Sequence, residues 1–88
     1  MTSQDKEDPL EPEFTEKQGQ YLAFIYAFTK VNGLPPAEAE IARFFGITPP
    51  SVHRMIVELH RKGLITRMGG RARTIRVLLE PEDLPVLR

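Results

Sequence analysis

Residues 34–63 read LPPAEAEIARFFGITPPSVHRMIVELHRKG, and this stretch decides the fold. It predicts two short helices, the first over about residues 37–45, separated by a turn at Gly46. Glycine suits that turn because it accepts the left-handed backbone at little cost. Gly63 predicts the end of the second helix, since glycine is frequent just beyond helix termini. Two short helices joined by such a turn are typical of a helix-turn-helix.

The sequence defines the first residue of the second helix of this unit only to within one or two positions. Pro50 disfavours a helical conformation at Pro49, the residue before it. Thr48 is the best capping side chain in this region, because its hydroxyl can accept a hydrogen bond from a free backbone N–H of the first turn. We therefore favour Thr48 as the N-cap, with a helix that runs from there to Lys62.

A further helix is expected before this unit, over residues 15–32. Thr15 and Gln18 have the spacing of a capping box, in which each side chain bonds the backbone N–H of the other residue. Apolar residues recur at helical spacing after them until Asn32 and Gly33, which predict a left-handed stop.

A β-hairpin is expected after this unit. Alternation of apolar and polar residues predicts antiparallel strands at 64–68 and 74–77, and Gly69 and Gly70 predict the turn between them. The whole pattern is an α+β winged helix-turn-helix, with three helices followed by a two-stranded antiparallel β-hairpin. Residues 15–79 form this domain, which lies between a disordered acidic arm at 1–14 and a tail at 80–88.

The charge of the chain is segregated although the net charge is zero. Residues 17–79 hold ten basic and three acidic residues, whereas the acids gather at both ends. A basic central region predicts a polyanionic partner, and double-stranded DNA fits it best. The first residues show no secretory signal, and the longest apolar run, 21–28, is too short to cross a bilayer, so we expect a cytoplasmic protein with no membrane contact.

Catalysis, metals and cofactors are not expected. The chain has no cysteine, so disulfides and cysteine-ligated zinc are excluded. His53 and His60 lie on one predicted helix, but only Glu58 is near enough to join them, which leaves the ligand set incomplete. Ser3 and Ser51 are the only serines, and neither lies in a nucleophile motif. An enzyme is therefore not expected.

The second helix of the unit has one apolar and one polar face. Its core-facing stripe is Val52, Met55, Ile56 and Leu59. The opposite face presents Pro50, Arg54, Val57 and Arg61, with Ser51 and His53 on its flanks. Arg54 is the first candidate for reading a base, because arginine donates two hydrogen bonds to guanine. Val57 is either a contact for a thymine methyl or an ordinary exposed aliphatic residue.

The remaining cations suit the DNA backbone. Arg61, Lys62 and Arg67 are candidates for phosphate contacts, which give salt-sensitive affinity without reading sequence. Arg61 and Lys62 also suit the negative end of the helix dipole, and both roles can hold together. Arg71 and Arg73, expected at the tip of the hairpin, would reach phosphates or a minor groove.

These motifs together resemble the N-terminal DNA-binding domain of LexA-type repressors. The resemblance spans Thr15 to about Leu79 and includes GLPP at 33–36, AEIAR at 39–43, RKGLI at 61–65 and RTIR at 73–76. It implies a winged helix that binds an operator. It also implies that bases are read at the positions of Thr48, Pro50, Ser51, His53 and Arg54.

Two departures from the family limit what can be carried over. The turn before the second helix looks one residue shorter, and Pro50 stands where the family tends to have a polar residue, so the operator sequence does not transfer. LexA repressors have a C-terminal self-cleaving peptidase domain that also dimerises them, and the sequence stops where that domain would begin. We therefore do not expect release by self-cleavage.

The helix expected at 15–32 is apolar on every side between Tyr21 and Phe28. Ala23, Tyr26 and Ala27 occupy the face that should be polar, which predicts an interface for a second copy or another partner. The competing interpretation is cover from within the chain. Its candidates are Leu84, Val86 and Leu87 at one end and Leu10 and Phe14 at the other.

Two functions follow from these patterns. The first is a sequence-specific DNA-binding transcriptional regulator, more simply a repressor, with the second helix in the major groove and a basic wing on the backbone or in the minor groove. The alternative is a protein-interaction module that uses the apolar first helix and has only nonspecific affinity for nucleic acid.

Overall fold

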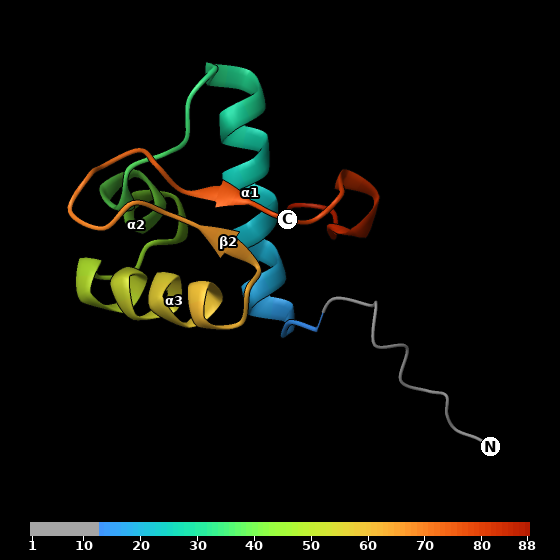
Figure 1. Cartoon of the computed structure of the whole chain (residues 1–88), viewed down its shortest axis with the longest axis horizontal. Helices are drawn as coiled ribbons and strands as arrows, with labels where there is room; N and C mark the ends of the chain where they lie inside the picture. Colours follow the sequence, from blue (N-terminus) through green and yellow to red (C-terminus); the bar gives the residue numbers. More distant parts are fainter. Residues whose placement is uncertain (1–12) are drawn as a thin grey trace.

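The computed structural model describes residues 13–88. Its elements, in chain order, are α1 (Glu16–Asn32), α2 (Glu38–Phe45), α3 (Pro49–Arg61), β2 (Ile65–Thr66), β3 (Arg76–Val77) and a 3-10 turn, η1 (Pro81–Asp83). The strands pair antiparallel, with Ile65 opposite Val77. Three helices followed by a two-stranded antiparallel sheet confirm the predicted α+β winged helix (Figure 1). The predicted acidic arm lies outside the described residues except for Glu13 and Phe14.

The ends of α1 are those that its sequence predicts. Gln18 N donates to Thr15 Oγ1 at 3.1 Å, and Thr15 N donates to Gln18 Oε1 at 3.0 Å, which is the reciprocal pattern of a capping box. Thr15 is therefore the N-cap and the helix begins one residue later. Gly33 closes α1 in the left-handed region at φ 79°.

The turn between α2 and α3 also follows its sequence. Gly46 ends α2 with φ 67° and donates its N–H to Ala42 O. Thr48 caps α3, because its hydroxyl accepts from Ser51 N at 3.4 Å. Pro49 then occupies the first helical position, where its missing N–H costs nothing. This geometry settles the open start of α3 in favour of the Thr48 cap.

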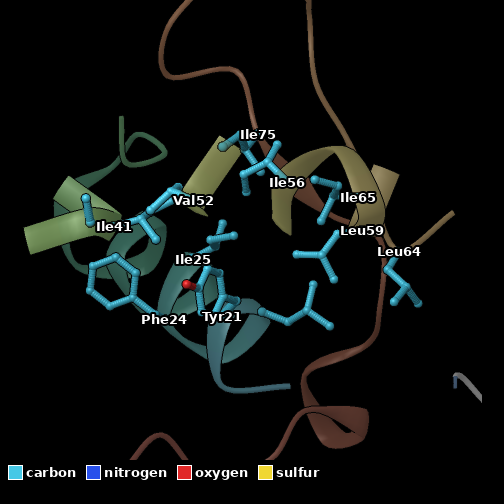
Figure 2. Packing of buried hydrophobic residues seen from close by; sticks show 12 residues of the cluster. Tyr21, Phe24, Ile25, Ile41, Val52, Ile56, Leu59, Leu64, Ile65 and Ile75 are labelled. Atoms are coloured by element: carbon cyan, nitrogen blue, oxygen red, sulfur yellow. The ribbon is translucent and has the colours of Figure 1, made fainter. Parts of the chain in front are cut away.

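One hydrophobic core joins the three helices to the wing, and Figure 2 shows its side chains converging. α3 contributes the fully buried Val52, Ile56 and Leu59, so the predicted apolar stripe is confirmed. Ile41 enters from α2 and Ile65 from β2, and both are buried. The core therefore fixes α3 to α2, which leaves the opposite face of α3 exposed.

The apolar character of α1 has an explanation within the chain. Consecutive residues 21–25 are all buried, because α1 contacts α2 on one side and β3 on another. The tail covers a further side: Gln20 Nε2 donates to Val86 O at 2.9 Å, and Arg88 N donates to Gln20 Oε1 at 2.8 Å. Leu84 and Leu87 pack against the same core. A helix surrounded in this way needs no polar face.

The expectation that α1 has an exposed apolar face was wrong for Ala23, which is only 5% exposed. Tyr26 and Ala27 are half-buried, and Tyr26 lies beside β3, where both border one small hollow. The interpretation of cover from within the chain holds for Leu84, Leu87 and Phe14, whereas Val86 is 82% exposed. Leu10 lies outside the described residues.

The strands of the wing are shorter than predicted, with two residues each instead of five and four. Beyond Thr66 the two strands no longer pair through their backbones. The Thr74 hydroxyl forms hydrogen bonds with the backbone of the loop instead. Met68 N donates to Thr74 Oγ1 at 2.9 Å, and Thr74 Oγ1 donates to Arg71 O at 3.1 Å. The segment from Arg67 to Ile75 is therefore a loop fixed by a side chain.

Candidate nucleic-acid interface

The face of α3 that points away from the core is the first part of the candidate interface. It exposes Pro50, His53, Arg54, Val57 and Arg61, whereas Ser51 is half-buried. Val57 is 42% exposed, so this face also presents an apolar side chain. The N-terminal half of this face combines hydrogen-bond donors with an apolar contact, the combination that reads base edges in a major groove.

Arg54 is positioned by the residues that begin the helix. Thr48 Oγ1 donates to Ser51 Oγ at 3.0 Å, and Ser51 Oγ accepts from Arg54 Nη2 at 3.3 Å. Within residues 13–88 Arg54 forms no salt bridge. One weak bond leaves most of its five N–H donors free, so the guanidinium is oriented yet available to a ligand.

The wing lies beside the N-terminal half of α3, and a hollow of about 310 Å³ separates them. His53 borders it from α3 and Glu38 from α2, and their side chains meet at 3.3 Å between Nδ1 and Oε2. Arg67 and Arg71 border it from the wing. His53 of α3 and two arginines of the wing therefore border one surface depression.

The two arginines predicted at the wing tip differ in what they contact. Arg71 is exposed and, among the described residues, has no salt bridge. Arg73 instead turns back to α2, where Nη1 and Nη2 donate to the two carboxylate oxygens of Glu40 at 2.8 and 3.0 Å. The guanidinium of Arg73 is therefore already paired within the chain, and its expected contact with phosphates stays a prediction.

The backbone of Arg73 is also unusual, since its φ is 62°. A residue with a Cβ loses roughly 1–2 kcal/mol in this left-handed conformation. The bidentate pair is charge-assisted and offsets part of that cost. The same contact explains why the pKa of Glu40 lies below its ordinary value: the Arg73 hydrogen bonds lower it most, followed by the bond from Ala37 N.

Of the three cations expected on backbone phosphates, Arg61 and Lys62 are already hydrogen-bonded to other side chains. Arg61 pairs with Glu58 on its own helix, which lowers the pKa of the Glu58 carboxyl through a side-chain hydrogen bond. Lys62 Nζ donates to Gln18 Oε1 at 2.9 Å and ties the end of α3 to the start of α1. Arg67 is half-buried, and its Nε lies shielded from solvent without a partner among the described residues. These side chains lie at the edge of the interface and contribute to the fold.

Two acidic residues that organise this surface were missed by sequence reasoning. Glu38 and Glu40 pair with His53 and Arg73, which lie 15 and 33 residues away along the chain. Both residues lie in the first turn of α2, where acidic residues are common because they interact favourably with the helix dipole. Only the fold reveals the long-range partners.

The described part of the chain lacks two other kinds of site. No group of three His, Cys, Asp or Glu side chains lies close enough to hold a metal ion within residues 13–88. No helix in the same range has both the length and the apolar character that a membrane span requires.

The sequence is similar to a known family of DNA-binding domains. The profile of the LexA DNA binding domain matches residues 11–74. LexA repressors from Thermotoga petrophila and Thermotoga neapolitana are 43% and 45% identical over 65 residues, 74% of this chain. The repressor of Pseudothermotoga lettingae is 39% identical over 80 residues, or 89% of this chain and 40% of its own length. The chain spans about a third of the length of the two Thermotoga repressors. It belongs to the family of LexA DNA-binding domains.

Proposed function

We propose that the chain is a sequence-specific DNA-binding repressor of transcription, with α3 in the major groove and the wing on the phosphate backbone. The outward face of α3 carries the proposal most directly. There Arg54 is exposed, oriented through Ser51 and free of any acidic partner among the described residues. The relatives named LexA repressor add support for repression.

In this arrangement Arg54 reads a guanine, for which its guanidinium can donate to O6 and N7 together. His53 lies beside it with one ring nitrogen near Glu38, so the other nitrogen is turned to solvent or to a base. Val57 lies one turn further along the helix and suits a thymine methyl. The contact surface is therefore the N-terminal half of α3.

Arg71 is the cation of the wing that best fits a phosphate contact. Its exposure and lack of an acidic partner within residues 13–88 leave its charge available. Each phosphate that a protein neutralises releases counterions, so loss of one such contact reduces the salt dependence of binding. Arg71 should thus govern affinity, whereas Arg54 governs sequence preference.

The protein-interaction alternative loses part of its support in the burial of α1. Part of the apolar face on which it depended is covered, because Ala23 is buried and Gln20 bonds the tail, whereas Tyr26 and Ala27 are half-buried. The outward face of α3, by contrast, is exposed.

Selection from a pool of random DNA duplexes at near-physiological salt tests the proposal. The wild type should enrich a defined motif, and Arg54→Ala should relax one position of it, equivalent to a loss of about 1–3 kcal/mol of discrimination. An inverted repeat in the motif would indicate that two copies bind together.

Arg61→Ala is the matched control, because it removes an arginine from the same helix that is paired with Glu58. It should leave the motif unchanged. The proposal fails if the wild type enriches no motif, or if Arg54→Ala and Arg61→Ala alter the motif equally.

A further inference from the structure

The contact between Arg73 and Glu40 is the most developed polar link between the wing and the helices. Both guanidinium Nη atoms face the two carboxylate oxygens, and Arg73 Nη1 also donates to Pro35 O at 3.3 Å. The side chains are 38% and 24% exposed, so the pair is partly shielded from water. A planar two-point contact fixes direction as well as distance.

Glu40 is itself held in place, which makes it a firm anchor. Its Oε1 accepts from Ala37 N at 2.8 Å in the first turn of α2. α2 in turn packs against α3 through the buried Ile41 and Ala42. An arginine bound to Glu40 is therefore fixed relative to the helix proposed to enter the groove.

Ile65 and Ile75 anchor the two ends of the wing in the core, and few directed bonds hold the loop between them. Its strands pair over two residues each, and its loop runs across to the region of α2 (Figure 1). The hollow of about 310 Å³ lies beside this loop, with His53 of α3 on its border. Within residues 13–88, the bonds from Arg73 to Glu40 are the only side-chain hydrogen bonds between the loop 67–75 and the helices.

We propose that Arg73 is a positioning residue for DNA binding, whose pair with Glu40 holds the wing beside α3 and so places Arg71 at the phosphate backbone. The inference rests on the proposed function. It assigns Arg73 and Glu40 one shared role, although only one of them is basic. An acidic residue near DNA would otherwise repel the phosphates, and its removal would strengthen binding.

Three variants test the shared role: Glu40→Gln, Arg73→Gln and the double variant. In Glu40→Gln the glutamine side chain keeps an oxygen that can accept from Ala37 N, so the start of α2 is preserved. Each single variant should weaken binding to the duplex enriched by the wild type by about threefold to fivefold, the effect expected of one partly exposed ion pair. The double variant should be no weaker than either single one, because both remove the same contact.

The salt dependence distinguishes positioning from direct contact. The slope of log affinity against log salt should stay at the wild-type value in Arg73→Gln, whereas Arg71→Gln should reduce it by about 0.9. Arg88→Gln is the matched control. It removes an arginine of the tail that is paired with Glu16 of α1, on another side of the molecule. Its affinity should equal that of the wild type.

Two results would overturn the inference. One is Glu40→Gln binding as tightly as the wild type while Arg73→Gln weakens binding and lowers the slope, which would make Arg73 a phosphate contact. The other is a result of amide hydrogen exchange measured without DNA. The amide of Arg71 donates to Met68 O at 3.2 Å, and we expect it to exchange faster in Glu40→Gln and Arg73→Gln than in the wild type. Unchanged exchange would refute a positioning role even if the wild type enriched no motif, and that lack of enrichment would by itself refute the proposed function.

Discussion

The helix-turn-helix and the wing form one surface but are held in place by different forces. α3 buries Val52, Ile56 and Leu59 completely in the shared core. The wing pairs two residues in each strand, and its loop depends on the hydroxyl of Thr74 and on the guanidinium of Arg73. Apolar contacts fix α3 along its length, whereas the wing is anchored in the core at Ile65 and Ile75 and its loop between them is fixed by a few directed bonds.

This difference separates two properties of the molecule. Burial of apolar side chains is distributed over many neighbours, so a change there affects the stability of the whole domain. A hydrogen bond in a loop fixes one segment, so its loss opens that segment at little cost to the rest. Substitutions of the buried residues of α3 should therefore change stability most, whereas substitutions in the wing loop should change DNA affinity more than stability.

The largest effect is expected from Ile56→Ala in the centre of α3. Ile56 is 0% exposed and lies among core residues from α1 and the wing (Figure 2). Removing its side chain leaves a cavity and should lower the free energy of unfolding by about 2–5 kcal/mol. Urea denaturation followed by circular dichroism measures this directly.

Val57→Ala provides the control, because Val57 is the next residue of the same helix and is 42% exposed. Its free energy of unfolding should change by no more than about 0.5 kcal/mol. Equal losses in both variants would mean that burial does not distinguish the two faces of α3, so the core would not be what holds this helix in place.

A smaller effect is expected from Thr74→Val in the wing. The hydroxyl of Thr74 accepts from Met68 N and donates to Arg71 O, so valine removes both bonds at similar size. The free energy of unfolding should fall by about 1 kcal/mol. The amide of Met68 should lose protection against hydrogen exchange, while amides in α3 keep theirs. Uniform loss of protection across α3 would show that the wing and the helices open together.

The same contrast explains how much of the fold the sequence predicted. All three helices follow from local signals, as do the Thr15 and Thr48 caps and the glycines at 33 and 46, whereas the bond from Ala37 N to Glu40 at the start of α2 was not predicted. The buried face of α3 follows from helical periodicity. These features depend on residues close together in the chain, and sequence patterns report such contacts well.

The features that the sequence did not predict depend on distant residues. For α1 the sequence left a partner face and cover from within the chain both open, and only the fold shows the tail, more than 60 residues away, bonded to Gln20 through Val86. Arg73 pairs with Glu40 from a backbone with positive φ, and the sequence has no glycine at this position that would predict such a backbone. Arginine in a basic hairpin looks like a DNA contact whether or not an acid lies nearby. Only the three-dimensional arrangement distinguishes Arg73 from Arg71.

The smallest expected effect concerns pH and tests the wing through Glu40. The hydrogen bonds from Arg73 and then from Ala37 hold the pKa of Glu40 below its ordinary value of 4.5. Because the folded state binds the proton less tightly than the unfolded state, the pair stabilises the protein fully above that value and is lost as the pH falls through the lower folded pKa. The stability difference between wild type and Glu40→Gln should therefore be larger at about pH 7 than at about pH 3.

Glu58→Gln sharpens this comparison, since the pKa of Glu58 is also lowered, first by its hydrogen bond with Arg61. Both variants should show the same direction of pH dependence in urea denaturation. They should differ in DNA binding at neutral pH: Glu40→Gln loosens the wing and weakens binding, whereas Glu58→Gln breaks a pair within α3 and should not weaken it. A stability difference for Glu40→Gln that grows as the pH falls would contradict the pairing, because protonation of Glu40 should remove the contact that the variant lacks.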